Sequence, residues 1–119
     1  MSNEDTDMRD NARELEKAVV GHSIRAVAVE QDRMVLTLDT GTSVTVRNTY
    51  DCCAFTDLDD VVLNLNKIGH VITSVKTEDG YTKWHIMAQM DAVLKMDVSW
   101  SEGSGYYMVG FVITVEENK

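Results

Sequence analysis

The chain is short of positive charge, cysteine, long apolar runs and proline, and three of these shortages exclude whole classes of protein. Eleven lysine and arginine residues face 20 aspartate and glutamate residues among 119, which leaves a formal net charge of −9. This charge repels nucleic-acid phosphates and anionic lipid headgroups, so direct binding to nucleic acid or to a membrane is not expected. The complete lack of proline in a turn-rich chain has no physical explanation in the sequence.

The few cysteines and the short apolar runs point to a cytoplasmic protein. The chain has two cysteines, and structural disulfides are rare in reducing compartments. Its longest apolar stretch, Met108 to Ile113, is interrupted by Gly110 and is far too short to cross a bilayer. The acidic start, Met1-Ser2-Asn3-Glu4-Asp5, does not resemble a secretory signal peptide. We therefore expect a soluble chain in the cytoplasm.

The chain also lacks the sequence motifs of common enzymes. No phosphate-binding loop, metal-ligand spacing or hydrolase nucleophile elbow occurs in it. Asp57, Asp59 and Asp60 resemble the start of a calcium loop, but Val61 and Val62 occupy the positions where the pattern must continue. We therefore expect neither a cofactor nor a metal ion, and we favour a role that is not enzymatic.

The remaining composition is that of one ordinary globular domain. Hydrophobic residues make up 44% and charged residues 26% of the chain, close to the averages for soluble domains. A chain of this length suffices for one hydrophobic core. We expect residues 1–7 to form a flexible acidic tail and residues 8–119 to form a single domain.

A short amphipathic helix is predicted over residues 8–20. Ala12, Leu15, Ala18 and Val19 fall at helical spacing, with acidic residues before them and a glycine at position 21 to end the helix. The apolar stripe is thin, so we expect the helix to pack at the rim of the domain.

A β-rich core is predicted from residue 22 to residue 116, because the apolar period changes from helical to two. The alternation is clearest where Leu94, Met96 and Val98 share one face, and Asp79-Gly80 is the strongest hairpin signal. The predicted strands cover residues 22–30, 34–39, 44–46, 71–78, 81–88, 92–100 and 106–116.

One interruption is predicted in the middle of this core. Asp57 to Leu65 returns to helical spacing behind a cap at Thr56 or Asp57, so a short helix is expected there. The tight turns elsewhere favour antiparallel strands over βαβ units. The predicted fold is thus α+β and mainly β, with about seven antiparallel strands in a curled sheet or a sandwich, an N-terminal helix and a short middle helix.

The first candidate site is Asp51-Cys52-Cys53. Adjacent side chains of a strand point to opposite faces, so two neighbouring cysteines need a special reason to be there. They could form a vicinal disulfide, bind a metal ion with His70 or His85, or supply a nucleophile. The interpretation that we favour is packing of two small apolar groups beneath the predicted middle helix, with Asp51 capping nearby backbone.

The second candidate site is a surface for binding another protein. Aromatic residues and methionines gather towards the ends of the late strands, and such side chains anchor interfaces when they are exposed. Core packing is the commoner fate of such residues, so both interpretations stay open. The candidate interface residues are Tyr81, Trp84, Met87, Tyr106, Tyr107 and Met108.

Several segments together resemble a family of small uncharacterised proteins encoded by actinobacteria and by phages that infect them. The resemblance covers about residues 20 to 116, and its most specific elements are D-C-C-A and G-Y-Y-x-x-G-F. It implies a domain of unknown function and transfers no catalytic residue. The segments that carry it are Val35 to Thr42, Asp51 to Ala54, Ile72 to Val75, Glu78 to Trp84 and Gly105 to Phe111.

Taken together, these features favour a non-enzymatic protein-binding domain, encoded by a phage, that modulates host physiology or defence. Its expected partner is a host protein, and a homodimer is a second expectation. Two alternatives remain. One is a small cysteine-dependent enzyme or redox sensor built on Cys52 and Cys53. The other is an acidic mimic of DNA that inhibits a nucleic-acid enzyme, which would require carboxylates in two rows on one face.

Overall fold

One helix is followed by nine strands in the parts of the chain that the computed structural model describes, residues 6–50, 55–101 and 110–117. The helix and most strands lie close to their predicted positions. The elements are α1 (Thr6–Val19), β1 (Ile24–Val29), β2 (Arg33–Leu38), β3 (Ser43–Arg47), β4 (Thr49–Tyr50), β5 (Phe55–Leu63), β6 (Ser74–Glu78), β7 (Lys83–Ala88), β8 (Asp91–Ser101) and β9 (Val112–Glu116).

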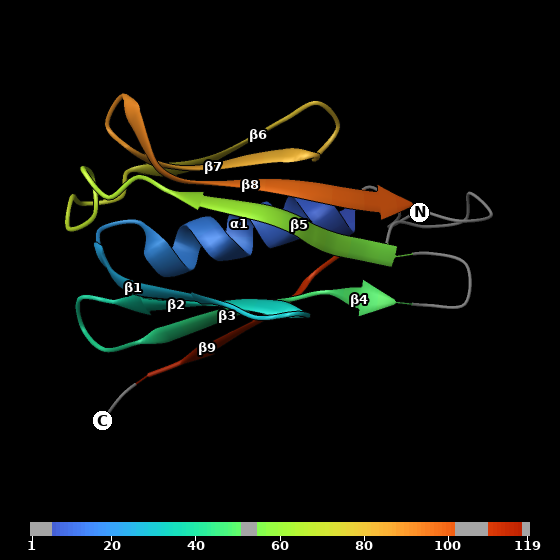
Figure 1. Cartoon of the computed structure of the whole chain (residues 1–119), viewed down its shortest axis with the longest axis horizontal. Coiled ribbons are helices and arrows are strands. Elements are labelled where there is room, and N and C mark those ends of the chain that lie inside the picture. Colours follow the sequence, from blue (N-terminus) through green and yellow to red (C-terminus); the bar gives the residue numbers. More distant parts are fainter. Residues whose placement is uncertain (1–5, 51–54, 102–109, 118–119) are drawn as a thin grey trace.

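The strands form two antiparallel sheets, one above the other in Figure 1. Sheet A has four strands in the order β1-β2-β3-β9, and sheet B has five strands in the order β4-β5-β8-β7-β6. The prediction of a mainly β, antiparallel fold with an N-terminal helix is confirmed. The strand number exceeds the predicted seven because β4 and β5 lie where no strand was expected.

The core lies between the sheets, and the two-residue period of the strands fills it. On β2, every second side chain is fully buried: Met34, Leu36 and Leu38. On the other sheet, Trp84 and Ile86 of β7 point inward in the same way, as predicted. The ring of Trp84 packs edge-on against Phe111 with 5.7 Å between the ring centroids, which links the two sheets.

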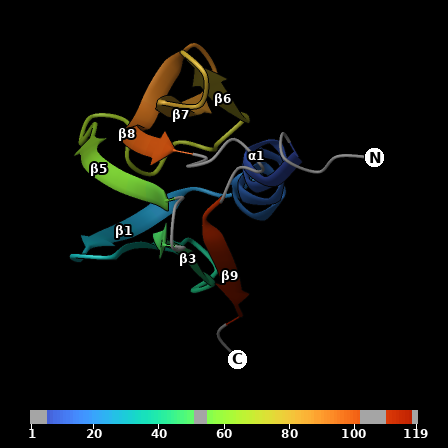
Figure 2. The same cartoon turned by 90° about the vertical axis from the view of Figure 1, so that its right-hand side faces the viewer.

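Helix α1 closes one long side of this sandwich, where it lies between the edge strands β6 and β9 (Figure 2). Met8, Leu15 and Val19 on its inner face are fully buried. The helix packs at the rim as expected, but its inner face is longer than the thin stripe that was predicted. Met8 and the buried polar Asn11 extend this face by about one turn beyond Ala12. The helix also begins at Thr6, inside the segment predicted as a tail.

The end of α1 follows the sequence closely. Gly21 has a φ of 90°, a left-handed conformation that suits glycine after a helix. Its N–H donates to the carbonyl of Ile72, and the N–H of Ile72 donates to the carbonyl of His22. These bonds join the end of the helix to the chain that leads into β6.

The short middle helix predicted over residues 57–65 is wrong. Phe55–Leu63 is strand β5, which pairs along its whole length with β8. The pairing contains a β-bulge between Leu58 and Asp60, where the register shifts by one residue. Because of the bulge, the inward-pointing residues Leu58 and Val61 are three positions apart instead of two. A spacing of three is also typical of one face of a helix.

The predicted Asp79-Gly80 hairpin joins β6 to β7, but its turn is longer than expected. Asp79, Gly80 and Tyr81 all have positive φ, at 53°, 63° and 65°. Strand β7 therefore begins at Lys83 rather than at Tyr81. Of the last predicted strand, residues 106–109 lie outside the described residues, and within the described part the strand begins at Val112.

Candidate functional site

The cysteine motif is not part of the described structure. Asp51, Cys52 and Cys53 lie outside the described residues, as do Tyr106, Tyr107 and Met108 of the predicted interface. Among the described residues, no group of three or more histidine, cysteine, aspartate and glutamate side chains could hold a metal ion. The chemistry predicted for the two cysteines stays a prediction.

The other three predicted interface residues point in different directions. Trp84 is only 1% exposed and belongs to the core, so it does not reach a partner of the folded domain. Met87 is half-buried on the outward side of β7, and Tyr81 is half-buried in the turn before it, where its ring packs beside that of Trp84. Among the described residues, Tyr81 and Met87 are thus the members that solvent can reach.

Two indole groups hold the turn that carries Tyr81. Trp84 Nε1 donates to the carbonyl of Tyr81 at 2.9 Å, and Trp100 Nε1 donates to the carbonyl of Gly80 at 2.7 Å. A tyrosine with positive φ is strained, and such strain persists only where the surroundings enforce it. The turn is therefore a firmly held corner at one end of sheet B.

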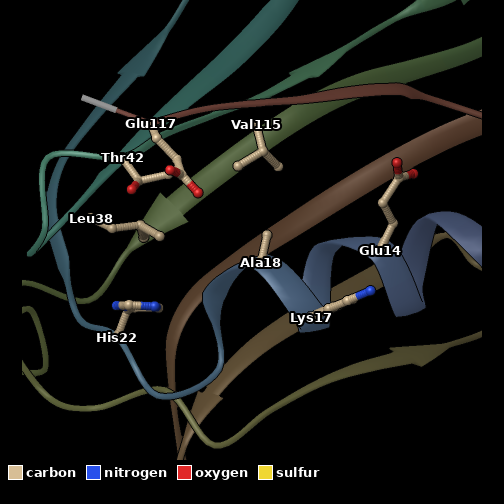
Figure 3. Close-up of a pocket in the computed structure, with 8 residues that line it drawn as sticks. All are labelled: Glu14, Lys17, Ala18, His22, Leu38, Thr42, Val115 and Glu117. Atoms are coloured by element: carbon tan, nitrogen blue, oxygen red, sulfur yellow. The ribbon is translucent and has the colours of Figure 1, made fainter. Parts of the chain in front are cut away.

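A groove of about 330 Å³ runs between α1 and the end of sheet A (Figure 3). Its floor is apolar, formed by Ala18, Leu38 and Val115, and charges of both signs stand at its rim. His22, at one end, lies 3.0 Å from Asp39 through Nδ1 and Oδ1. This hydrogen bond holds the pKa of Asp39 below its ordinary value of 3.8. The mixed rim favours no particular ligand.

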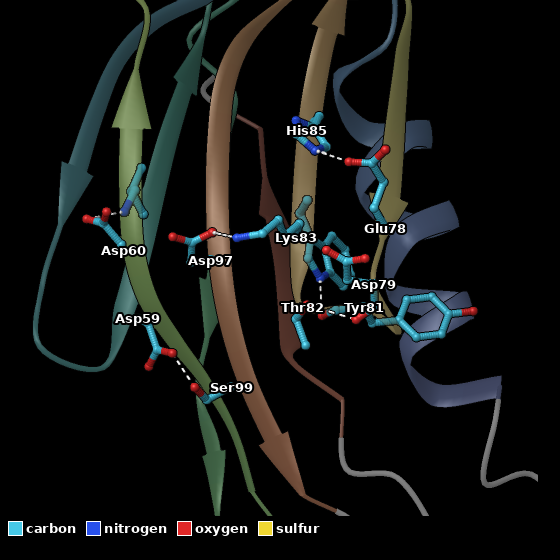
Figure 4. A network of polar contacts seen from close by, with 12 residues as sticks. Asp59, Asp60, Glu78, Asp79, Tyr81, Thr82, Lys83, His85, Asp97 and Ser99 are labelled. Carbon is cyan, nitrogen blue, oxygen red and sulfur yellow. Dashed lines mark hydrogen bonds and ion pairs between the residues drawn. The ribbon is translucent and has the colours of Figure 1, made fainter.

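The outer face of sheet B shows a clearer organisation, because its charges are sorted into rows across the strands. Figure 4 shows the residues of the first row, with His85 of the second. In the first row, Asp60 on β5 lies opposite Asp97 on β8. Asp97 lies opposite Lys83 on β7, and their side chains form an ion pair at 3.1 Å. Lys83 in turn lies opposite Glu78 on β6. We call these four residues the acidic row, since it holds three carboxylates and one ammonium group.

The next row along the strands has the opposite character. Lys95 on β8 lies opposite His85 on β7, and His85 lies opposite Lys76 on β6. We call these three residues the basic row. Residues two apart on a strand share a face, and each residue adds about 3.4 Å, so the basic row lies about 7 Å from the acidic row. His85 Nε2 contacts Glu78 at 3.0 Å and so connects the rows.

The acidic row contains an unfavourable pair. Asp60 and Asp97 are directly opposite on neighbouring strands, an arrangement that destabilises a sheet when both side chains are charged. Asp60 Oδ1 accepts a hydrogen bond from the N–H of its neighbour Val61, and the bulged Asp59 accepts one from the hydroxyl of Ser99. Within the described residues, no cation pairs with Asp59 or Asp60.

A known protein family covers most of the residues that form this fold. The sequence model of a family described as a domain of unknown function, DUF7448, matches residues 17–113. The chain belongs to this family. The match runs from the end of α1 into β9, so the DUF7448 domain comprises nearly all of both sheets but little of the helix. No curated protein and no solved structure matches the chain.

The charge rows were missed at the level of the sequence for a specific reason. The acids of the DUF7448 domain at positions 57–60 were assigned to the start of a helix, whereas they lie on a strand. A search for the β-bulge would have placed Asp60 on the outer face. Its pairing with Asp97, 37 residues later, depends on tertiary register that no local pattern encodes.

The helix α1 has neither the length nor the apolar content to span a membrane, and the described residues contain no other candidate span.

Proposed function

We propose that this chain is a non-enzymatic protein-binding domain that is encoded by a phage of actinobacteria and modulates a host protein in the cytoplasm. The observation that carries the proposal is the sorted charge on the outer face of sheet B, with Asp60 opposite Asp97. A like-charged cross-strand pair lowers stability. A fold keeps such a pair most readily where the charges serve an interaction.

The surface has the physical properties of a docking face. Helix α1 lies along one side of the sandwich, between β6 and β9, and leaves the outer face of sheet B uncovered by any described element (Figure 2). A shallow depression of about 520 Å³ lies over the rows where they reach β6 and β7, and its lining includes Glu78 and His85 of the rows together with Met87. A flexible methionine in a depression adapts to different partner side chains.

The arrangement of charge indicates the partner. A host surface with a cationic stripe would align with the acidic row and with Asp59, and an anionic group beside that stripe would meet the basic row. Complementary rows fix the orientation of docking and speed up association more than they strengthen it. The carboxylates form one row beside a basic one rather than two rows, so the geometry favours a protein partner over mimicry of DNA.

The experiment compares three versions of the chain as bait in crosslinked lysate of the actinobacterial host. The test variant carries Asp59→Asn, Asp60→Asn and Asp97→Asn. The control variant carries Asp10→Asn, Glu14→Gln and Glu116→Gln, which remove the same charge from exposed positions elsewhere. We expect one host protein to bind the native chain and the control equally, and to bind the test variant at least about tenfold more weakly.

A stability measurement on Asp60→Asn accompanies this experiment. Removing one of the two facing charges should raise the free energy of unfolding by about 0.2 to 1 kcal/mol while weakening capture of the host protein. If no host protein binds above background, or if the test variant binds it as well as the native chain, the proposal is wrong.

A further inference from the structure

Strand edges offer a second interaction surface, because an edge strand presents main-chain groups that another strand can pair with. Three of the four sheet edges are protected within the described residues. At β6, the N–H of Val75 donates to Glu16 Oε2 of α1 at 2.9 Å. At one edge of sheet A, α1 lies alongside β9, and Asn11 bonds both the N–H and the carbonyl of Phe111, the residue just before the strand.

The edge of sheet B at β5 is protected in a different way. Its first two residues pair with β4, and the N–H of Leu58 donates to Asn48 Oδ1 at 2.9 Å. The bulge and the charged Asp59 and Asp60 follow directly. Charged side chains and bulges are common devices that prevent a foreign strand from pairing.

Strand β1, at the remaining edge, lacks such protection along most of its length. It has a bulge at its start, between Ile24 and Ala26, but from there to Val29 it carries four uncharged residues. None of these four makes a side-chain or loop hydrogen bond to another described element besides its pairing with β2. Val29 is 56% exposed although its side chain points towards the core layer.

The hydrogen-bond pattern tells which main-chain groups of β1 are free. The N–H of Glu30 donates to the carbonyl of Arg33 across the turn at 2.8 Å, so Glu30 is directed towards β2. Alternate residues of an antiparallel strand face alternate sides. The main-chain N–H and carbonyl groups of Ala26 and Ala28 are therefore directed towards β2. Those of Val27 and Val29 are directed away from the sheet.

We propose that a second copy of this chain pairs antiparallel with β1 and forms a homodimer. The two four-stranded A sheets then join into one sheet of eight strands. The free groups allow Val27 of one copy to lie opposite Val27 or Val29 of the other. Pairing of β1 with itself about a twofold axis uses the same patch twice, as the commonest oligomers do.

Charge complementarity favours a second copy as the partner of this edge. Arg25 stands at one end of β1, where its guanidinium also donates to the carbonyl of Asp39 at 2.7 Å. Glu30 follows the other end and lies 3.8 Å from Arg33 Nε within its own chain, so both side chains are exposed but already have a partner.

In the two antiparallel registers, Glu30 of one copy lies opposite Ile24 or Ala26 of the other, the two neighbours of Arg25. The long side chains of Glu30 and Arg25 can bridge this offset of one residue, and the same pair forms again across the axis. The net charge of −9 repels two chains at long range, yet the edge itself carries one charge of each sign. Raising the salt concentration should therefore promote the dimer by screening the long-range repulsion.

The first experiment swaps these charges and measures molar mass by light scattering over a dilution series. Arg25→Glu alone should dissociate the dimer, because two glutamates then meet, and Glu30→Arg alone should do the same. An equimolar mixture of the two variants should recover twice the monomer mass, since each pair again joins opposite charges. Arg47→Glu makes the same charge change inside sheet A and should leave the native dimer intact.

The mixture is decisive because a variant that merely misfolds is not rescued by another. A native chain that stays monomeric at every concentration and salt level overturns the proposal. So does a dimer that neither charge change affects, since another surface must then form it.

A second measurement locates the contact on the strand. In hydrogen exchange of the native chain, the amides of Val27 and Val29 should become protected as concentration rises, whereas those of Ala26 and Ala28 should be protected throughout. Ala28→Lys should abolish the concentration dependence, because a lysine on an edge disfavours strand pairing. Rapid exchange at Val27 and Val29 in a proven dimer would contradict pairing through β1.

Discussion

The two long sides of the sandwich differ in how the edges of their sheets end (Figure 2). On one side, α1 fills the gap between β6 and β9 and binds main-chain groups of the chain at both edges through Glu16 and Asn11. On the other side lie β1 and β5, and no described helix covers them. We call these the closed side and the open side.

The difference teaches that α1 contributes more than apolar packing. A buried main-chain N–H or carbonyl without a partner costs stability, so a helix that covers strand edges must supply polar partners as well. Asn11 does this with one donor and one acceptor, much as a neighbouring strand would. The open side lacks such partners at β1, which leaves that edge available for another chain.

The largest expected effect is the difference in stability loss when one apolar side chain is truncated on the closed side and one on the open side. Leu15→Ala on the closed side should lower the free energy of unfolding by about 3 kcal/mol, because Leu15 is fully buried and its removal leaves a cavity. Val29→Ala on the open side should lower it by less than about 1 kcal/mol, because Val29 is already 56% exposed. Urea unfolding, followed by tryptophan fluorescence, measures both values in the monomer.

Equal losses for the two variants would contradict the assignment of a closed and an open side. Glu14→Ala, at an exposed position on α1, serves as the control and should change little. A loss at Glu14 as large as that at Leu15 would mean that helix propensity, rather than packing on the closed side, governs the result.

The polar link of the closed side gives the next effect. Asn11 is 6% exposed, and its side chain both donates to the carbonyl of Phe111 at 3.0 Å and accepts from its N–H. Asn11→Ala should lower the free energy of unfolding by about 2 kcal/mol, because two buried main-chain groups lose their partner.

Asn11→Asp tests the same link more finely. An aspartate retains the acceptor for the N–H of Phe111 but loses the donor to its carbonyl, so this variant should also be destabilised. A variant as stable as the native chain would show that the carbonyl of Phe111 finds another donor.

Much of the fold follows from the sequence because the alternation is local. Residues of β2, β7 and β8 that were assigned to the inner face are buried, among them Leu36, Ile86 and Met96. The hairpin at Asp79-Gly80 was predictable from its turn residues. These features depend on neighbours within a few positions, and a single sequence contains that information.

The failure at β5 has an equally local cause. A β-bulge inserts one residue, so inward positions separated by two become separated by three at that point. Leu58 and Val61 therefore fit a helix as well as a bulged strand. The acids between them strengthened the wrong interpretation, because acids are also favoured at a helix start.

The candidate surfaces could not be predicted at all, for reasons of distance. Asp60 and Asp97 meet only because β5 pairs with β8 in one particular register. The exposure of β1 likewise depends on which sheet edge α1 covers, and Asn11 reaches Phe111 across 100 positions of sequence. Such relations come from the assembled sandwich rather than from any segment of it.

The smallest effect is expected where the closed side passes into the open side, at the link between α1 and β1. There His22 lies 3.0 Å from Asp39, and this hydrogen bond lowers the pKa of the carboxyl group. A pKa that is lower in the folded chain than in the unfolded one means that the charged form stabilises the fold. The contribution is complete above about pH 4, near the unfolded pKa, and disappears as pH falls through the folded pKa.

Asp39→Ala should therefore reduce the free energy of unfolding slightly at neutral pH, and the gap to the native chain should close below about pH 4. Because Asp39 is exposed, solvent screens its interaction and the gap stays well below that of Asn11→Ala. Urea unfolding at several pH values measures it. A gap that widened in acid would show that the protonated carboxyl group, rather than the carboxylate, holds His22, and would reverse the sign of the coupling at this link.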